Sequence, residues 1–134
     1  MRIAFPMLML AVLAAPLSQA DARWKPEYAS HTQEQRDWYE SQTTTAATRE
    51  RINAYWYISC CLHSDTVKAR FAVSKTDGAD KWFYQIEGTT EWRTVPADTV
   101  QPGIRTPVDQ PVLFVDATAR DFGPVCFFPG VGGI

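Results

Sequence analysis

The sequence predicts an α+β fold, in which an N-terminal helical arm precedes a small antiparallel β-meander or barrel-like sheet of about five short strands. Three observations support this class. Residues 23–54 are polar and carry helix signals, residues 55–128 contain short apolar or alternating stretches, and turn residues rather than helices separate those stretches. Short strands joined by tight turns are typical of an antiparallel meander. In this division of the chain, residues 129–134 form a Gly-rich tail.

The first twenty residues are typical of a secretory signal peptide. Arg2 supplies a minimal positive charge, residues 3–17 are almost wholly apolar, and the small residues that follow predict cleavage after Ala20 or Ala22. The apolar run of about 15 residues is shorter than the ~20 that a membrane-spanning helix needs, which disfavours the alternative of an uncleaved anchor. We therefore expect an exported protein, periplasmic or extracellular, with no transmembrane segment in the mature chain.

Helix signals are concentrated in residues 23–54. Ser30 is a candidate N-cap with Gln33 at the N3 position of a capping box. Trp38 and Tyr39 give the first helix a narrow apolar stripe. The β-branched threonines at 43–45 interrupt it, and we expect a second short helix around residues 46–54.

From residue 55 onward the pattern changes to strand. Residues 55–62 are too aromatic and too short for an independent helix, so we expect a strand there. Residues 66–74 and 81–87 alternate in polarity with the period of half-buried strands, and Asp77-Gly78 marks the turn between them. The apolar positions of these two strands are Val67, Ala69, Phe71, Val73, Trp82, Tyr84 and Ile86.

Three further strands are expected, at residues 91–95, 112–115 and 124–128. A Gly88 turn precedes the first of them, and a Pro-rich connection separates the first from the other two. Residues 92–100 resemble the part of small Src-homology-3-like barrels in which a Pro-containing turn links two strands. Such a barrel is therefore an alternative to an open meander.

Charge and composition limit the partners of the mature chain. The sequence of 134 residues has 13 basic and 15 acidic residues, and loss of Arg2 makes the net charge of the remaining 114 residues about −3. This weak acidity argues against nucleic acid or anionic lipid as a charge-recruited partner, because both require a basic face. Most of the 5 Trp, 5 Tyr and 7 Phe must fill a small core.

Two of the three cysteines are neighbours: Cys60, Cys61 and, far downstream, Cys126. An oxidising compartment favours pairing one of the first two with the last. Adjacent side chains of a strand point to opposite faces, and alternation places Cys60 on the more apolar face, which slightly favours it. Closing a loop of about 66 residues stabilises a fold by about 4 kcal/mol in the chain-entropy model. The alternative is a strained bridge between the neighbours, with Cys126 as a core thiol.

Four features of the chain, taken in order, resemble a group of small exported bacterial and phage proteins of unknown function. The resemblance spans residues 38–133 and implies bacterial export and a β-rich domain with the Cys pair near Cys126. It implies no activity, ligand, cofactor or catalytic residue. The features are the Trp38-Tyr39 pair, the vicinal Cys60-Cys61 followed by Asp65, the Trp92-x-x-Val95-Pro96 segment, and Cys126-Phe127-x-Pro129-Gly130-x-Gly132-Gly133.

Cys61, His63 and Asp65 lie within five residues and suggest a cysteine-dependent hydrolase. A cysteine nucleophile needs a positioned base and an oxyanion hole, and known sites assemble these from distant segments. We therefore favour a strand end followed by a polar turn. A zinc site that also used Cys60 is disfavoured because the usual two-residue ligand spacing is missing. We expect no metal and no cofactor.

Acidic residues offer two further groupings. Glu87 and Glu91 flank the Gly88 turn and suggest a glycosidase pair, but hairpin ends commonly carry solvated charges, which we favour here. Asp116, Arg120 and Asp121 suggest a loop ion cluster of little energetic weight.

Aromatic residues of the central strands suggest a binding strip formed by Trp82, Phe83, Tyr84 and Trp92. Because neighbours in a strand alternate, either Phe83 or the Trp82/Tyr84 pair points outward or beneath the helical arm. An exposed strip would stack on sugar rings or on side chains of a partner. Cover by the N-terminal helix is the alternative that we favour, since such exposure is uncommon on small monomers.

These observations favour a small exported, disulfide-stapled domain with a non-catalytic binding or accessory role in the cell envelope. An envelope protein or cell-wall glycan is the expected partner. The rival is a cysteine-dependent or acid–base hydrolase centred on Cys61, His63 and Asp65, which would need a reactive thiol of low pKa. A structural domain of a larger surface assembly is a third possibility.

Overall fold

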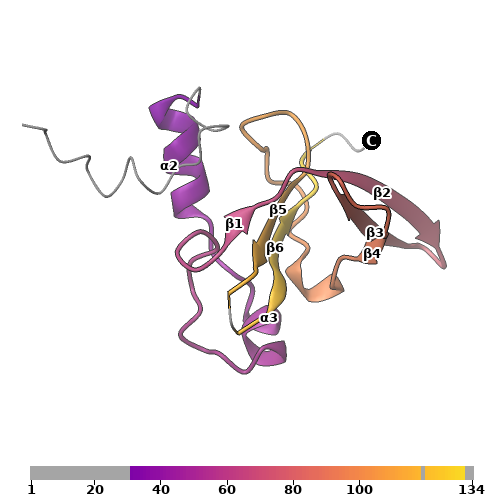
Figure 1. The fold of residues 1–134 in the computed structure, drawn as a ribbon, viewed down its shortest axis with the longest axis horizontal. Helices are drawn as coiled ribbons and strands as arrows, with labels where there is room; N and C mark the ends of the chain where they lie inside the picture. The colour runs from indigo at the N-terminus through magenta and orange to yellow at the C-terminus, as the bar shows by residue number, and fades with distance from the viewer. Residues whose placement is uncertain (1–30, 119, 132–134) are drawn as a thin grey trace, which may run out of the picture. The chain divides into compact units, whose positions relative to one another are not determined.

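The computed structural model describes residues 31–118 and 120–131, in which the strands form two sheets of three. The expected signal peptide, Ser30 and residues 132–134 of the tail lie outside the described residues. Both sheets are antiparallel, with strand orders β1–β5–β6 and β2–β3–β4 (Figure 1), so a single sheet of about five strands is not what forms. The elements are α2 (Gln33–Ser41), α3 (Ala46–Arg51), β1 (Asp65–Thr66), β2 (Ala69–Thr76), β3 (Ala79–Ile86), β4 (Arg93–Thr94), the 3-10 turn η2 (Ala97–Thr99), β5 (Val112–Asp116) and β6 (Gly123–Phe128).

The alternating stretch expected as one strand at 66–74 contributes to both sheets. β1 pairs with β5, whereas β2 pairs with β3. The chain changes partner between them: the Val67 N–H donates to the Leu113 carbonyl at 3.2 Å, and the Lys68 carbonyl accepts from the Glu87 N–H at 2.9 Å. Alternation predicted which side chains face inward, but it carries no information about which strand lies alongside.

The β2–β3 hairpin forms as its turn residues predict. Thr76 pairs with Ala79, which leaves Asp77-Gly78 as a two-residue connection. Both residues have positive φ, 55° for Asp77 and 77° for Gly78. Turns of this kind match the right-handed twist of the flanking strands. The register places Phe71 opposite Tyr84 and Val73 opposite Trp82 on the inward face.

β5 and β6 are buried on both faces, as continuous apolar runs predict. Leu113 and Phe127 join Trp82 and Tyr84 in the core shared with the other sheet. The opposite face packs against α2. There the ring of Phe128 lies 5.2 Å from that of Trp38, and the ring of Phe114 lies 6.2 Å from that of Tyr39.

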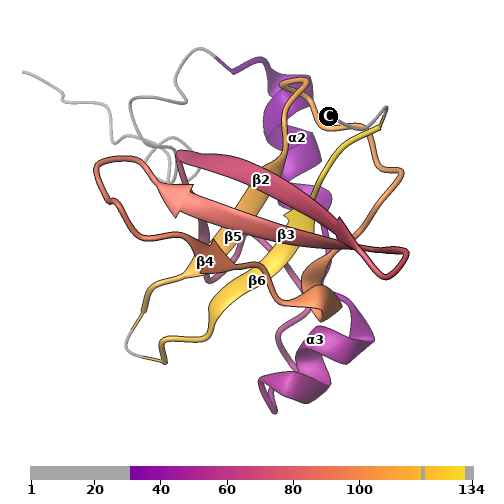
Figure 2. The same ribbon diagram turned by 90° about the vertical axis from the view of Figure 1, so that its right-hand side faces the viewer.

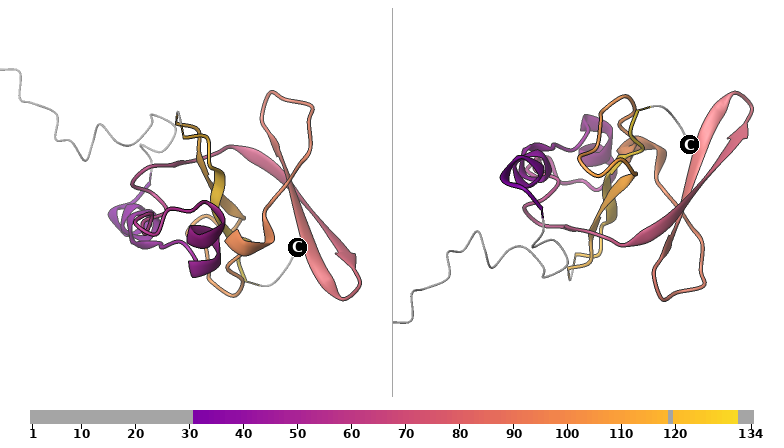
Figure 3. Two further views of the ribbon diagram at one scale, coloured as in Figure 1. Left: turned by 90° about the horizontal axis from the view of Figure 1, so that it is seen from below. Right: turned by 90° about the horizontal axis from the view of Figure 1, so that it is seen from above.

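Three layers therefore follow one another: α2, the β1–β5–β6 sheet and the β2–β3–β4 sheet (Figure 3). The helix α3 lies beside the middle sheet, next to η2 and β6. Strands of the third layer cross those of β5 and β6 rather than running alongside them (Figure 2). Trp82 and Tyr84 of β3 are covered by the middle sheet and not by the N-terminal helix, which corrects the expected cover. The helix instead covers the far side of the same middle sheet.

The helical arm has the two expected helices, but its first cap differs from the predicted one. Thr32, not Ser30, is the N-cap of α2, and Gln35 completes a reciprocal capping box with it. The capping box therefore lies two positions later than the predicted pair of Ser30 and Gln33. α3 is capped by Thr45 and ends at Arg51, so the expected second helix at 46–54 is shorter than predicted.

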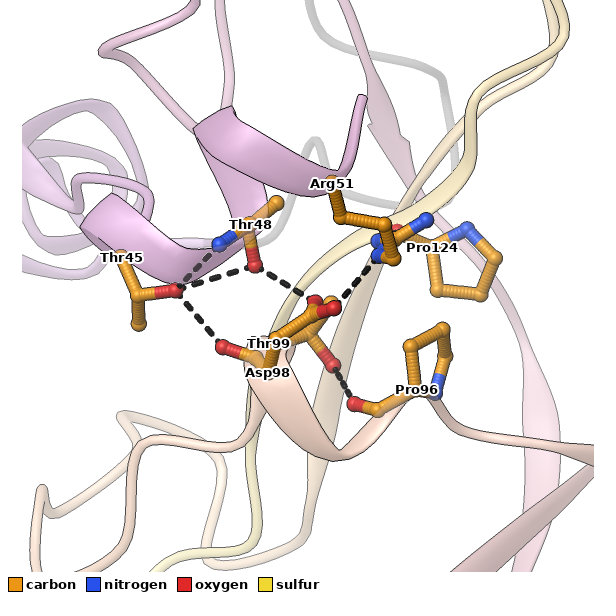
Figure 4. A network of polar contacts seen from close by, with 7 residues as sticks. All are labelled: Thr45, Thr48, Arg51, Pro96, Asp98, Thr99 and Pro124. Atoms are coloured by element: carbon orange, nitrogen blue, oxygen red, sulfur yellow. Dashed lines mark hydrogen bonds and ion pairs between the residues drawn. The ribbon is translucent and has the colours of Figure 1, made fainter. Parts of the chain in front are cut away.

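A polar network holds α3 against η2 and β6 (Figure 4). The Asp98 carboxylate accepts from the Thr48 hydroxyl at 2.8 Å and from Arg51 Nε at 2.6 Å. The Thr45 hydroxyl donates to the Asp98 carbonyl at 2.6 Å, and Arg51 Nη2 donates to the Pro124 carbonyl at 3.0 Å. This network fixes the end of α3, where the following loop begins.

Residues 55–62 do not form the predicted strand. They form successive turns, and among the described residues their β-type backbone pairing is one isolated bridge between Thr43 and Ser59. We name residues 52–64, between α3 and β1, the aromatic loop (Figure 1). The preference for Cys60 over Cys61 assumed that these residues alternate as a strand, and that assumption was wrong. Cys60 is nevertheless the buried member of the pair.

Candidate functional site

The aromatic loop carries most of the large apolar side chains that the described part of the molecule exposes. Tyr55 is 69% exposed, Trp56 55%, Ile58 49% and Leu62 60%, and six such residues occur in the described ranges altogether. Side chains of this size at these exposures present on the order of 500 Å². Exposed apolar side chains gathered in one short segment are often functional.

A disulfide anchors this loop to the middle sheet. Cys60 bonds Cys126 of β6 at an S–S distance of 2.05 Å, and both residues are fully buried. This confirms the predicted long-range bridge and excludes the vicinal one. Cys61, the next residue, carries a thiol and is half-buried.

Tyr57 is a second anchor, and its side chain is fully buried between exposed neighbours. Its hydroxyl donates to Asp116 Oδ2 at 2.9 Å, and its ring lies 5.7 Å from that of Phe122. Burial, followed by the hydrogen bond and the charge of Asp116, raises the pKa of Tyr57 well above its usual value. The phenol therefore stays protonated and holds the middle of the loop.

Asp116 is the acceptor that receives this phenol, and it is fully buried at the end of β5. The Thr118 N–H and hydroxyl donate to its other oxygen at 2.9 and 2.5 Å. Burial raises the pKa of Asp116, but the hydrogen bonds from Thr118 and Tyr57, with the charge of Arg120, outweigh burial and lower that pKa overall. The loop ion cluster was expected to have little energetic weight, but its member Asp116 is a fully buried carboxylate at the end of β5.

The segment after α2 fixes the loop backbone. The Thr44 N–H donates to the Ile58 carbonyl at 2.8 Å, and the Thr44 hydroxyl donates to the Tyr57 carbonyl at 2.6 Å. The Cys60 N–H donates to the Gln42 carbonyl at 3.0 Å. Two remote cross-links and this backbone pairing therefore define the conformation of an otherwise irregular segment.

Two serines satisfy further polar groups of the same loop. Ser59 Oγ accepts from the N–H groups of Cys61 and Leu62 at 3.2 and 3.1 Å. The Ser64 hydroxyl donates to the Cys60 carbonyl. Two N–H groups and one carbonyl at this turn therefore have partners within the protein, although the Leu62 side chain is exposed.

At the tip, Trp56 is held from two sides. The guanidinium of Arg120 lies 4.7 Å from its ring centroid, and the His63 ring meets it edge-on at 5.4 Å. His63 also packs 5.4 Å from Tyr57. Aromatic and cation–π contacts of this geometry restrict a side chain without covering it.

The predicted hydrolase residues are placed around this loop in different settings. His63 packs between two aromatic rings, Cys61 is half-buried in the loop, and Asp65 is exposed at the start of β1. The contacts that place His63 are those with the rings of Trp56 and Tyr57. The hydrolase therefore remains a prediction without an observation that favours it.

The predicted aromatic strip is divided between the core and the surface. Trp82 and Tyr84 are 6% and 3% exposed and belong to the core, so they cannot form an exposed strip. Phe83 faces outward, half-buried, with Lys81 Nζ 5.7 Å from its ring, and Trp92 is 45% exposed. Alternation along β3 explains the division.

The remaining candidates are surface features. Glu87 forms an ion pair with Lys68 at 3.9 Å and Glu91 one with Arg93 at 3.3 Å, all on exposed side chains. Within the described ranges no group of three or more His, Cys, Asp or Glu residues could hold a metal ion. A small cavity of about 160 Å³ lies elsewhere, lined by Arg105, Asp109, Gln110, Pro111, Pro129 and Val131 among others.

Sequence reasoning missed Tyr55 and the roles of Tyr57, Asp116 and Arg120. One signal was available: Asp116-Ala117-Thr118 follows an apolar run, and a Thr two residues after an Asp can satisfy its carboxylate locally. Tyr57, which donates to the same carboxylate, lies 59 residues earlier, and no local sequence pattern predicts that pairing.

Comparison with known proteins assigns no family. No protein-family model, no curated protein and no solved structure matches the chain significantly. No helix among the described residues is long and apolar enough to cross a membrane. We therefore argue function from the loop itself.

Proposed function

We propose that the protein is a small exported, disulfide-stapled domain that binds a component of the cell envelope through the aromatic loop and catalyses no reaction. One observation carries this proposal: the segment with four exposed large apolar side chains is also the segment with the most elaborate anchoring. Exposed apolar surface of this extent marks interaction sites. A disulfide is typical of oxidising compartments, which supports export.

Rigidity is what makes the loop suited to binding. An interface loses affinity for every loop or side chain that it must order, so a surface already fixed in one conformation binds more tightly than a flexible one of equal area. Trp, Tyr and Arg are also the residues most often found at the centres of interfaces. Here Trp56 and Tyr55 stand at the tip, with Arg120 stacked on the former.

The envelope-binding role is tested by retention in a bacterial host that exports the full chain. We expect the Trp56→Ser/Leu62→Ser variant to lose at least fivefold in the fraction that sediments with washed envelopes after osmotic lysis. Trp92→Ser is the matched control, since Trp92 is a comparably exposed tryptophan outside the loop. Equal retention of all three proteins would contradict the proposal.

A second measurement separates binding from hydrolysis. We expect the Cys61 thiol to alkylate slowly with iodoacetamide at pH 6, as an ordinary thiol does. Rapid alkylation at that pH would indicate a thiolate of low pKa and would favour the hydrolase instead.

A further inference from the structure

Among the described residues, the two sheets end in four edge strands, and three of these edges are short or covered. β1 and β4 contain two residues each. β6 begins with Gly123-Pro124, and Phe127 near its other end forms a parallel bridge with Val100. The Gln101 N–H also donates to the Phe127 carbonyl at 2.8 Å. Short length, proline and a covering segment are the means by which proteins keep sheet edges from pairing with other chains.

β2 is the exception, and it lies at one edge of its sheet (Figure 2). It runs for 8 residues, Ala69–Thr76, contains no proline, and keeps one continuous register with β3. Within the described ranges β3 is its one strand partner. A long and regular edge of this kind can accept a further strand.

The pairing with β3 determines which backbone groups of β2 stay open. The two-residue turn makes Thr76 and Ala79 a hydrogen-bonded pair, and such pairs alternate along an antiparallel ladder. The Lys68 carbonyl, which accepts from the Glu87 N–H, has the same phase. The intervening residues therefore direct their N–H and C=O groups away from β3. They are Ala69, Phe71, Val73 and Lys75.

The inward-facing side chains of β2 are less covered than those opposite them on β3. Phe71 and Val73 pack against the core but stay half-buried. Their cross-strand neighbours, Tyr84 and Trp82, are 3% and 6% exposed, because β3 has a strand on each side. A strand added at the β2 edge would thus bury apolar side-chain surface as well as satisfy open backbone groups.

The sequence of β2 is complementary to a second copy of itself. Antiparallel pairing of two β2 strands around a two-fold axis at Ala72 aligns the open backbone groups of one copy with those of the other. In that register Phe71 of each copy lies beside Val73 of the other. Pairs of an aromatic and a β-branched side chain are among those that stabilise sheets.

The charges of β2 also agree with this register. Arg70 comes to lie opposite Ser74 of the other copy, and Lys75 opposite Ala69, so no like charges face each other. An axis at Arg70 would instead set two guanidinium groups opposite each other. The net charge of −2 gives little long-range repulsion between copies.

From these observations we propose that the protein forms a two-fold dimer through β2, in which the two β2–β3–β4 sheets become one continuous sheet. Its outer edges are then the two-residue β4 strands. A two-fold contact removes the long edge of both copies at once, whereas an added peptide strand leaves a new open edge. The proposal concerns assembly and does not depend on the role of the aromatic loop.

A cysteine on the proposed axis tests the register. The two copies of Ala72 form a non-hydrogen-bonded pair with Cα atoms about 4.5 Å apart, which a disulfide can span. Ser74→Cys is the matched control on the same face, because its two copies lie roughly 13 Å apart along the strand. Both variants also carry Cys61→Ser, so that the natural thiol cannot cross-link. After export and mild oxidation, we expect at least tenfold more covalent dimer from Ala72→Cys than from Ser74→Cys on non-reducing gels.

Sedimentation equilibrium of the exported protein measures association without a cross-link. Ala72→Lys sets like charges opposite each other on the axis and should raise the dimer dissociation constant at least tenfold. The position is exposed, so the fold should persist, which thermal unfolding verifies. Thr94→Lys adds the same charge to exposed β4 and should change the constant less than twofold, as should Trp56→Ser/Leu62→Ser.

Three results would overturn the proposal. The first is a wild-type protein that stays monomeric at about 1 mM, where even a weak strand pairing is populated. The second is equal cross-linking at positions 72 and 74. The third is a dimer that weakens in Trp56→Ser/Leu62→Ser but not in Ala72→Lys, which would place the contact at the aromatic loop. Envelope retention tests the proposed function separately, so either proposal can fail without the other.

Discussion

The β2–β3 hairpin and the aromatic loop are comparably rich in aromatic residues, but they use them in opposite ways. The hairpin turns Trp82 and Tyr84 into the core, while the loop projects Tyr55 and Trp56 into solvent. The hairpin is ordered by its own ladder and a two-residue turn, whereas the loop is ordered by residues far away in the sequence, Cys126 and Asp116. The element that is held by contacts close in the sequence forms part of the core. The segment that is held by contacts far away in the sequence keeps its shape while some of its large apolar side chains stay exposed.

The largest effect is expected from removing the disulfide that holds the aromatic loop. Replacing both Cys60 and Cys126 by Ala should lower the free energy of unfolding by about 4 kcal/mol, because the unfolded chain regains the freedom of a 66-residue loop. Urea-induced unfolding measures this change. Cys61→Ala is the matched control and should cost about 1 kcal/mol or less, since it removes no cross-link. A double-variant loss below about 1 kcal/mol would mean that Tyr57 and the backbone pairing suffice to hold the loop.

Removing the second anchor should have an intermediate effect. Tyr57→Phe deletes one hydrogen bond to a buried carboxylate, and such bonds contribute about 1.5–3 kcal/mol. Tyr55→Phe makes the same chemical change at an exposed position and should shift stability by less than about 0.5 kcal/mol. Thermal unfolding of the two variants side by side measures the difference. Equal effects would show that the buried pair adds nothing.

The same pair predicts a pH dependence at both ends of the scale. The raised pKa of Tyr57 means that the folded state keeps this proton more tightly than the unfolded state, so stability falls as the pH rises above the ordinary value of 10.0. The lowered pKa of Asp116 means that its contribution is present above the ordinary value of 3.8 and is lost as the pH falls below it.

Melting temperature measured against pH tests this dependence. Tyr57→Phe should remove the part of the alkaline decline that belongs to this group, and Asp116→Asn should flatten the acid limb. If the melting temperatures of the wild-type protein and of Tyr57→Phe decline equally at alkaline pH, the decline does not come from Tyr57.

A smaller effect is expected in the hairpin. Gly78 has a φ of +77° with no atom within 4 Å of an added Cβ, so Gly78→Ala should cost about 1–2 kcal/mol through backbone strain alone. Gly78→Asn should cost less, because asparagine tolerates this conformation better. Equal losses for Ala and Asn would show that strain is not the cause.

The smallest effect is expected at the projecting side chains. Leu62→Ser should alter the free energy of unfolding by less than about 0.5 kcal/mol, because the side chain is 60% exposed. Chemical denaturation measures it. A loss above about 1.5 kcal/mol would show that the residue supports the fold rather than a contact with a partner.

The same contrast explains what the sequence could predict. Asp77-Gly78 and the alternation around Trp82 are local signals, and the hairpin formed as expected. The strand expected at 55–62 was wrong because backbone partners at Gln42 and Thr44 and a disulfide override local preference there. The division into two sheets depends on a change of partner at Val67, which alternation cannot register. The exposed loop was missed because an aromatic-rich segment is ordinarily core.

Burial of β6 on both faces has a consequence for the order in which the protein acquires its structure. Phe127 packs against Trp82 and Phe128 against Trp38, so β6 is the element that both outer layers share, and every other strand precedes it in the chain. A nascent chain that lacks residues 123–128 has only β5 to offer to these layers, and its cysteine at position 60 has no partner at position 126. The cross-link and the full packing of both outer layers therefore become available only after the last strand has been synthesised.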